Sequence, residues 1–278
     1  MLTRIISGAV GAALLAVVLF FHDTLLLPVA VAAMIAVMLY ELLRAVKLHK
    51  CVPVLAASEL CGISVPFIIR YMASFGEAAQ NLLTFAVTLV ASFVVFAVWL
   101  KKHKRIRYEQ VFFALACMIL VPQAMATMVR IERMDSSNGL FLLIMALCGA
   151  WIADTGAYFT GVAFGKHKLC PEISPKKTVE GFIGGILTTA LVYAVAFSLY
   201  FGFSPKKAVI AFVTGAAGAV VGAVGDLSAS MVKRQIGFKD YGKIMPGHGG
   251  LMDRFDSVLF VLPTFYVFMA YFGIQMYL

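Results

Sequence analysis

Residues 207–232, KAVIAFVTGAAGAVVGAVGDLSASMV, decide the fold. At 1.5 Å per residue a helix of this length crosses the ~30 Å hydrocarbon core of a bilayer. One carboxylate, Asp226, interrupts the apolar run, and a charge at a helix centre costs ~2.5–3.5 kcal/mol on insertion scales. The run therefore predicts a transmembrane helix whose Asp226 needs a partner, either a metal ion or a basic side chain such as Lys233.

Similar apolar runs recur along the whole chain of 278 residues. Hydrophobic residues make up 62% of it and charged residues only 13%, against roughly 25% charged residues in soluble domains. We therefore expect an all-α, polytopic integral membrane protein with about nine transmembrane helices, the first of them an uncleaved helix rather than a signal peptide. The expected spans are 4–21, 25–43, 52–74, 82–100, 110–129, 139–164, 178–202, 207–232 and 256–277.

The polar residues divide the chain into two regions. Residues 1–136 keep their charges in short loops, which predicts an N-terminal region of about five spans. Residues 137–278 carry Asp154, Asp226 and two long polar loops, which predicts that this C-terminal region holds the catalytic site.

The net charge of +9 comes from lysines and arginines that collect in alternate loops. The positive-inside rule then places the N-terminus and the loops 165–178 and 233–256 in the cytoplasm, where nucleotides are available. The sequence lacks the interleaved aromatic and basic residues that are typical of proteins that bind single-stranded nucleic acid. Anionic lipid or nucleotide therefore explains the positive charge better. The five cysteines have neither a CxxC nor a Cys/His spacing, so we expect neither a disulfide framework nor a zinc site.

The segment 233–256, KRQIGFKDYGKIMPGHGGLMDRFD, is strongly polar between two apolar runs. Its glycines allow backbone amides to approach a phosphate closely. Asp253 and Asp256 are three residues apart and would share a face of a helix, and oxygen ligands of this kind suit Mg²⁺. The role of His248 stays open. It contacts the substrate or stabilises the loop, it binds a metal ion, or it acts as a general acid.

Three further features have two interpretations each. The segment Ser174–Gly181, SPKKTVEG, begins the seventh span, where Lys176 and Lys177 predict either an anion site at a helix N-terminus or positive-inside anchoring. Asp154 in the sixth span is either functional or structurally paired with a lysine. The glycines of the eighth span favour close helix packing, and they also leave room for a ligand.

The spacing S-x-V-K-R-x4-K-D-x-G-x3-P-x-H-G-G-x2-D-R-x-D, which starts at Ser230, closely resembles that of the phosphatidate cytidylyltransferase (CDP-diacylglycerol synthase) family. The resemblance covers the second half of the chain, in Asp154–Leu169, Ser174–Gly181 and Gly225–Asp256. Two positions depart from the family's pattern, Val162 where a basic residue is frequent and Val179 where tryptophan is frequent.

This resemblance implies the reaction of CTP with phosphatidate to give CDP-diacylglycerol and pyrophosphate, in phospholipid biosynthesis. It implies Mg²⁺ with a second cation, held by Asp226 and Asp253 as catalytic and metal-binding residues. It also implies a bacterial protein of the inner (plasma) membrane, and a homodimer because family members are reported as dimers. The substrate-binding residues implied by the resemblance are Ser174, Lys176, Lys177, Ser230, Lys233, Arg234, Lys239, Asp240, His248 and Arg254.

Two rival functions remain open from the sequence. A CTP-dependent lipid kinase would use a similar nucleotide but transfer the γ-phosphate, so a label in the base would not enter lipid. A secondary transporter would also use an intramembrane carboxylate beside glycine-rich helices. No inverted repeat is visible, however, and the polar residues cluster on one side of the membrane.

Overall fold

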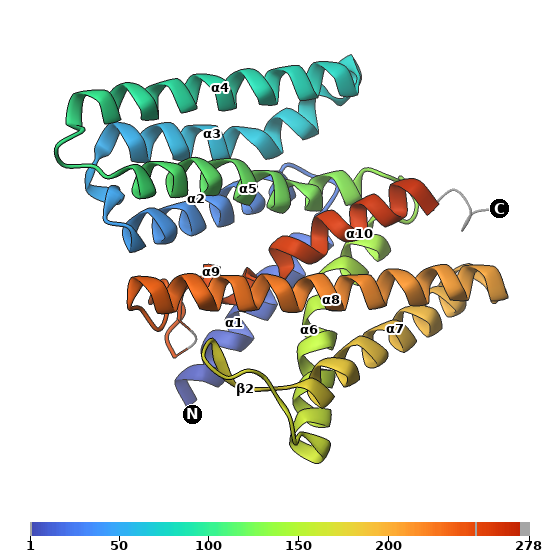
Figure 1. Cartoon of the computed structure of the whole chain (residues 1–278). Helices are drawn as coiled ribbons and strands as arrows, with labels where there is room; N and C mark the ends of the chain where they lie inside the picture. Colours follow the sequence, from blue (N-terminus) through green and yellow to red (C-terminus); the bar gives the residue numbers. More distant parts are fainter. Residues whose placement is uncertain (1, 248, 273–278) are drawn as a thin grey trace. The chain divides into compact units, whose positions relative to one another are not determined.

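The computed structural model describes residues 2–247 and 249–272, and most of them form helices (Figure 1). Two short 3₁₀ helices, η1 (Leu48–Lys50) and η2 (Met72–Phe75), lie between the longer elements. The α-helices are α1 (Leu2–Phe20), α2 (Leu26–Ala45), α3 (Val52–Tyr71), α4 (Glu77–Lys102), α5 (Tyr108–Glu132), α6 (Gly139–Phe164), α7 (Val179–Phe201), α8 (Pro205–Ile236), α9 (Met252–Phe255) and α10 (Val258–Phe272).

Within the described residues, eight helical segments are long and apolar enough to cross a membrane, with the shorter apolar helix Ile6–Phe20 in addition. The segment Met252–Phe272, which contains α9 and α10, counts as one of the eight. These segments coincide with the nine expected spans, which confirms the all-α polytopic fold. The last expected span runs on to residue 277, beyond the described residues.

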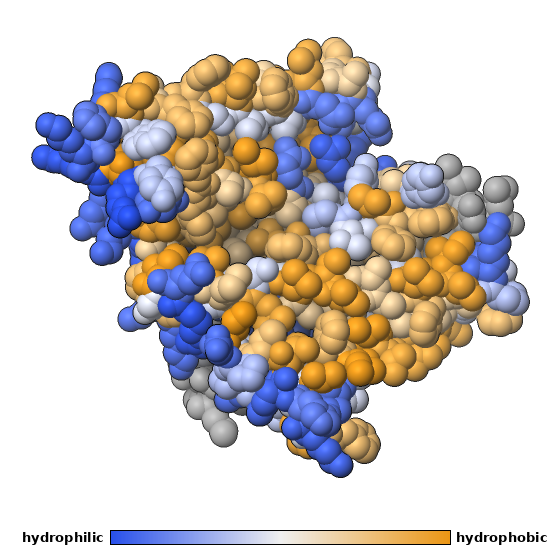
Figure 2. All heavy atoms as spheres, viewed as in Figure 1, coloured by the Kyte–Doolittle hydropathy of each residue, from blue (hydrophilic) through white to orange (hydrophobic). Residues whose placement is uncertain are grey.

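The outer faces of these helices are apolar, as a lipid environment requires. On α4, Leu82, Phe85 and Phe93 are exposed by 64–70%. Figure 2 shows hydrophobic residues over the sides of this helix and hydrophilic residues gathered at its ends. Such a surface is stable against hydrocarbon and would aggregate in water, so the chain is a multi-pass membrane protein.

The chain folds as two compact units, Met1–Arg133 with Ile236–Arg254, and Met134–Gln235 with Phe255–Leu278. The expected division into 1–136 and 137–278, with catalysis in the second region, stays a prediction about function. The structure adds one fact that the sequence did not indicate. The polar segment after α8 packs with the N-terminal helices rather than with the helices that flank it in the sequence.

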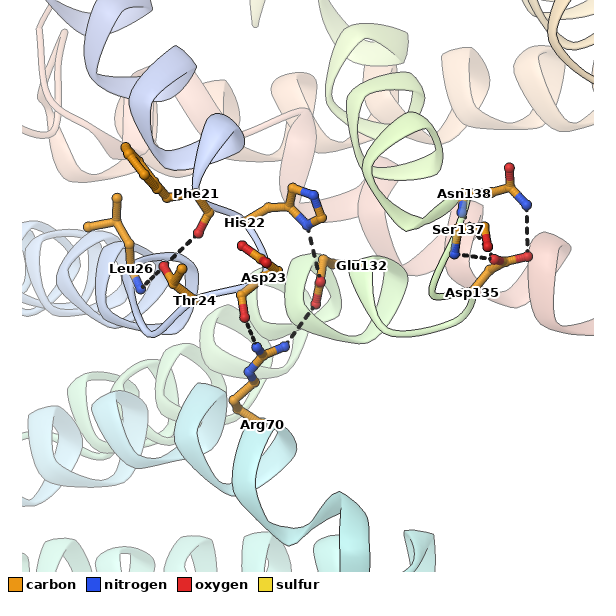
Figure 3. Close-up of polar contacts among 10 residues, drawn as sticks. All are labelled: Phe21, His22, Asp23, Thr24, Leu26, Arg70, Glu132, Asp135, Ser137 and Asn138. Carbon is orange, nitrogen blue, oxygen red and sulfur yellow. Dashed lines mark hydrogen bonds and ion pairs between the residues drawn. The ribbon is translucent and has the colours of Figure 1, made fainter.

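In the first unit, α3 packs against α2, α4 and α5. A polar network joins the ends of these helices (Figure 3). Arg70 at the end of α3 contacts Glu132 at the end of α5, with Nη1 3.3 Å from Oε2, and it also donates to the backbone oxygen of Asp23. His22 Nδ1 lies 3.2 Å from the other oxygen of Glu132. The network ties the α1–α2 connection to two membrane helices.

In the second unit, α6 and α7 lie side by side and α10 packs on α6. The fully buried Tyr193 donates its hydroxyl to the backbone oxygen of Met145 at 2.7 Å. The glycines of α8 make close helix packing possible, as expected. A Cβ at Gly215 would lie 2.9 Å from Thr189 O, and one at Gly225 would lie 2.7 Å from Asp256 O.

Two features of the second half interrupt the helices. A short antiparallel hairpin, β1 (Lys168–Cys170) and β2 (Ser174–Thr178), precedes α7. Asp256 and Ser257 form a turn between α9 and α10. Asp253 and Asp256 therefore do not share the face of one continuous helix, because the helix breaks at the second carboxylate.

Candidate functional site: a carboxylate cluster and a glycine-rich loop

Asp226 lies on α8 and forms an ion pair with Lys177 of β2. The side chains are 25% and 28% exposed, so the pair is partly shielded from solvent. The sequence predicted that this carboxylate is paired with a metal ion or a basic side chain. In the structure its partner is Lys177, in the hairpin of β1 and β2. Lys233, the basic partner that the sequence suggested, lies two helical turns further along α8.

Asp256 adds a second carboxylate to this region. Its side chain is 7% exposed, and Oδ1 accepts a hydrogen bond of 2.8 Å from the backbone N–H of Ser257. The charges of Asp226, Lys233 and Asp154 all act on it. We call Asp154, Asp226 and Asp256 the carboxylate cluster. The sequence placed Asp256 in the motif but not among the site residues, because only the turn at 256–257 brings it beside α8.

An apolar cavity of about 360 Å³ opens beside the cluster in the second unit. Its walls are mainly alanine, glycine and aliphatic side chains from α6, α7 and α8. Six residues with polar groups line it as well, and these are Asp154, Tyr158, Lys176, Lys177, Thr178 and Ser257. Gly222 of α8 lines the cavity, and a Cβ there would lie 2.9 Å from Val261. Close packing, one of the two expectations for the glycine stripe, is confirmed at this position; room for a ligand stays a prediction that the adjoining cavity supports.

The hairpin that carries the lysines is fixed to the start of α7. Thr178 caps the helix, because its Oγ1 accepts a hydrogen bond of 3.1 Å from Gly181 N. The carboxylate of Glu180 accepts the backbone N–H groups of Lys166 and His167, and His167 Nδ1 lies 2.6 Å from Glu180 Oε1. Helix α7 begins at Val179, close to the predicted 178, but Ser174, Lys176 and Lys177 lie on a strand before it.

The remaining predicted residues of the second unit follow Asp226 along α8. Ser230 and Lys233 are half-buried and Arg234 is exposed. Lys233 and Arg234 occupy the last turn of the helix, where cations interact favourably with the helix dipole.

The other predicted residues lie in the first unit, in or directly after the glycine-rich loop, by which we mean residues 237–251. Asp253 is 8% exposed, and its Oδ2 accepts the backbone N–H groups of Tyr241 at 2.8 Å and Gly250 at 2.9 Å. An open, polar cavity of about 680 Å³ lies along the loop. Lys239, Asp240 and Arg254 line this cavity and are exposed. His248 lies outside the described residues.

The oxygen donors of the two catalytic candidates fit Mg²⁺ chemistry. Among the residues that the structure describes, no three His, Cys, Asp or Glu side chains converge closely enough to hold a metal ion by themselves. Mg²⁺ is commonly held by one or two carboxylates with the substrate's phosphates and water, so Asp226 and Asp253 have the chemistry that such a site needs. Asp226 belongs to the second unit and Asp253 to the first.

Comparison with known proteins gives the same family along almost the whole chain. Residues 2–272 match the model of the cytidylyltransferase family. A protein of Bacillus subtilis (strain 168) named phosphatidate cytidylyltransferase is 36% identical over 276 residues, which cover 97% of this chain and 98% of that protein. A protein of the same name from Staphylococcus haemolyticus is 46% identical over 127 residues, 46% of this chain and 48% of its own length. The chain belongs to the cytidylyltransferase family.

Proposed function

We propose that this membrane protein transfers the cytidylyl group of CTP to phosphatidate, which gives CDP-diacylglycerol and pyrophosphate. The observation that carries the proposal is the similarity over 97% of the chain to a phosphatidate cytidylyltransferase. The site supports it, because lysines and carboxylates meet at an apolar cavity in a membrane domain.

The reaction requires little acid–base catalysis by the protein. A phosphatidate oxygen attacks the α-phosphorus of CTP, the bond from that phosphorus to the bridging oxygen breaks, and pyrophosphate leaves. The nucleophile is already an anion, so no general base is required. The protein's work is to bring two anionic substrates together and to stabilise the charge that grows on the leaving group.

The cavity of the second unit suits the lipid substrate. Its apolar walls fit the glycerol and the first part of the acyl chains, and Lys176 and Lys177 at its edge fit a phosphate. Lys177 already balances Asp226, so a bound phosphate would share this lysine with the carboxylate. Ser174, Ser230, Lys233 and Arg234 stay predicted substrate contacts.

The glycine-rich loop suits the nucleotide's phosphates. Lys239, Lys243 and Arg254 place three cations along an open, polar cavity. The exposed Gly247 at the same cavity would let the main chain approach phosphate oxygens. Asp240 at the same cavity is suited to accept hydrogen bonds from a sugar or base. His248 stays a predicted substrate contact.

The cofactor belongs to the same proposal. Asp226 and Asp253 would hold Mg²⁺, with a second cation beside it, and the cation would neutralise charge on the phosphates of CTP. Asp256 is a further candidate metal ligand, because it is buried and interacts electrostatically with Asp226.

Loop charge and the bacterial relatives support a proposed location in the cell. We place the chain in the plasma membrane with its N-terminus in the cytoplasm, which gives the site access to CTP. A homodimer, expected from the family, stays a prediction.

One experiment separates this function from its rivals. The protein is purified in detergent and incubated with phosphatidate and CTP that carries one label in the base and another in the γ-phosphate. We expect the base label in lipid and the γ label in pyrophosphate. Transfer of the γ label alone to an added lipid alcohol would indicate a lipid kinase. If the protein in detergent does not convert CTP and phosphatidate, and vesicles that contain it take up a solute in response to an ion gradient, the protein is a transporter.

A further inference from the structure

A buried carboxylate of the N-terminal helices is hydrogen-bonded to the end of the glycine-rich loop and to the residue that follows it. Glu41 lies near the end of α2 and is 1% exposed. Its Oε1 accepts the backbone N–H of Leu251 at 3.1 Å, and its Oε2 accepts the backbone N–H of Met252 at 2.9 Å. These donors are 210 and 211 residues away in the sequence, so nothing local explains the contact.

The loop is shaped to close on this carboxylate. A Cβ at Gly242 would overlap Oε1 of Glu41, and a Cβ at Gly250 would lie 2.5 Å from both carboxylate oxygens. Only glycine fits at these two positions, one in each arm of the loop. Glu41 is therefore enclosed by the two arms and also bound to the backbone that follows them.

The same backbone carries Asp253. Glu41 binds the N–H groups of Leu251 and Met252, the two residues directly before Asp253. Asp253 in turn binds the N–H groups of Tyr241 and Gly250. Two carboxylates thus hold four backbone amides of one short segment, and movement of Glu41 would move the main chain on which Asp253 and Arg254 are mounted.

We propose that Glu41 is a positioning residue for cytidylyl transfer, which sets the conformation of the glycine-rich loop and thereby the orientation of Asp253 and Arg254. The inference rests on the proposed function for its kinetic consequence, but its structural part is independent of activity. A carboxylate with two charge-assisted hydrogen bonds in a buried site is a rigid anchor, and small misplacements of catalytic groups can cost about a hundredfold in rate.

The decisive variant is Glu41→Gln, which keeps the size of the side chain and places an amide N–H₂ against one of the two backbone donors. The matched control is Glu59→Gln. Glu59 lies in the adjacent helix α3 of the same unit, and its buried Oε2 has no hydrogen-bond partner among the described residues. The control removes a membrane carboxylate without touching the loop.

Two readouts are taken from each purified variant. We expect hydrogen exchange of the amides at 250–253 to become at least about tenfold faster in Glu41→Gln and to stay unchanged in Glu59→Gln. We expect kcat to fall about a hundredfold in Glu41→Gln with little change in KM for CTP, and Glu41→Asp, which keeps the charge, to recover part of the rate. Unchanged exchange at 250–253, or equal losses of rate in both Gln variants, overturns the proposal.

A second pair of variants tests the contact itself. Gly242→Ala should slow the enzyme because the new methyl group meets Glu41. In Glu41→Ala/Gly242→Ala the contact with Glu41 is gone and the approach of the new methyl group to Gly250 Cα at 3.0 Å remains, so the double variant should lose less rate than the sum of the two single losses. Full additivity of the two losses would contradict the enclosure of Glu41 by the loop. If the wild-type protein shows no cytidylyl transfer, the proposed function fails, and the exchange data still decide whether Glu41 holds the loop.

Discussion

The acidic side chains of this chain act in two different ways. Asp226 meets a lysine, and the pair remains about a quarter exposed, so a charged substrate or cation can compete for either partner. Glu41 and Asp253 are both less than a tenth exposed and bind backbone amides. The ion pair leaves the charge of Asp226 available for chemistry, whereas Glu41 uses both of its oxygens to fix a loop. Asp253 stays a predicted metal ligand whose Oδ2 also accepts two backbone amides.

This difference predicts what Asp226→Asn does. The substitution keeps the size of the side chain and removes its charge, so any cation stabilisation of the leaving pyrophosphate is lost. We expect the rate to fall at least about a hundredfold, because several kcal/mol are lost at ~1.4 kcal/mol per decade. Membrane insertion should survive, because removing a buried charge eases it. The measurement is turnover by the purified variant across a Mg²⁺ titration.

The control for Asp226→Asn is Glu109→Gln, because Glu109 forms an exposed surface pair with Arg107 and such pairs contribute little to stability. Its rate should equal that of the wild type. A Lys177→Met/Asp226→Asn double variant should lose less than the sum of the single losses, since the two side chains form one ion pair. Normal turnover and normal metal dependence in Asp226→Asn would remove this residue from the site.

The sequence indicated Asp226 because an isolated charge in a long apolar run is costly and therefore informative. It could not indicate Glu41, since a glutamate near a helix end is ordinarily explained by the membrane interface. Only the return of residues 241–252 to α2 reveals its partners. The sequence indicated Asp256 as a carboxylate suited to Mg²⁺ on one helix face with Asp253. It could not indicate the place of Asp256 near Asp226, because that place depends on the turn at 256–257.

At the scale of elements, the helices were predictable and the hairpin was not. Length and hydropathy alone determine a membrane-spanning helix, so the starts of α3, α6 and α7 differ from the predicted spans by at most one residue. The strands β1 and β2 are three and five residues long, too short for a periodic pattern. Pro175 and Thr178 instead suggested the start of a helix in this segment, whereas α7 begins only after the second strand, at Val179.

The polar network at the ends of α3 and α5 should stabilise the first unit. Arg70→Gln removes a cation that is only 18% exposed and leaves Glu132, 8% exposed, with His22 alone. Since breaking a buried pair leaves a charge without compensation, we expect the free energy of unfolding to fall by about 1–3 kcal/mol. The measurement is the melting temperature of the purified protein in detergent.

Arg107→Gln is the matched control for Arg70→Gln, because Arg107 is 78% exposed and pairs at the surface with Glu109. Its melting temperature should stay within about a degree of the wild type. Equal stability of both variants would show that the network in Figure 3 contributes nothing to the fold.

At the scale of the whole molecule, the proposed function requires that both proposed phosphate-binding elements face the compartment that holds CTP. The hairpin belongs to the second unit and the glycine-rich loop to the first. Lysine and arginine counts in the loops predict a cytoplasmic location for both segments by the same rule. The rule depends only on the sequence. It predicts that the hairpin and the glycine-rich loop, which belong to different units, lie on the same side of the membrane.

Single cysteines at Lys168 and Lys243, in a variant without the native cysteines, test this orientation. Both lysines are exposed, so a thiol at either position can react. We expect an impermeant maleimide to leave both positions unlabelled in intact spheroplasts and to label both after lysis. Lys206, exposed in the first turn of α8, is the matched control, because the same rule places it outside and predicts labelling before lysis. Labelling of Lys168→Cys or Lys243→Cys in intact spheroplasts would put that segment on the side without CTP, and the cytoplasmic site proposed for this enzyme could not then be complete.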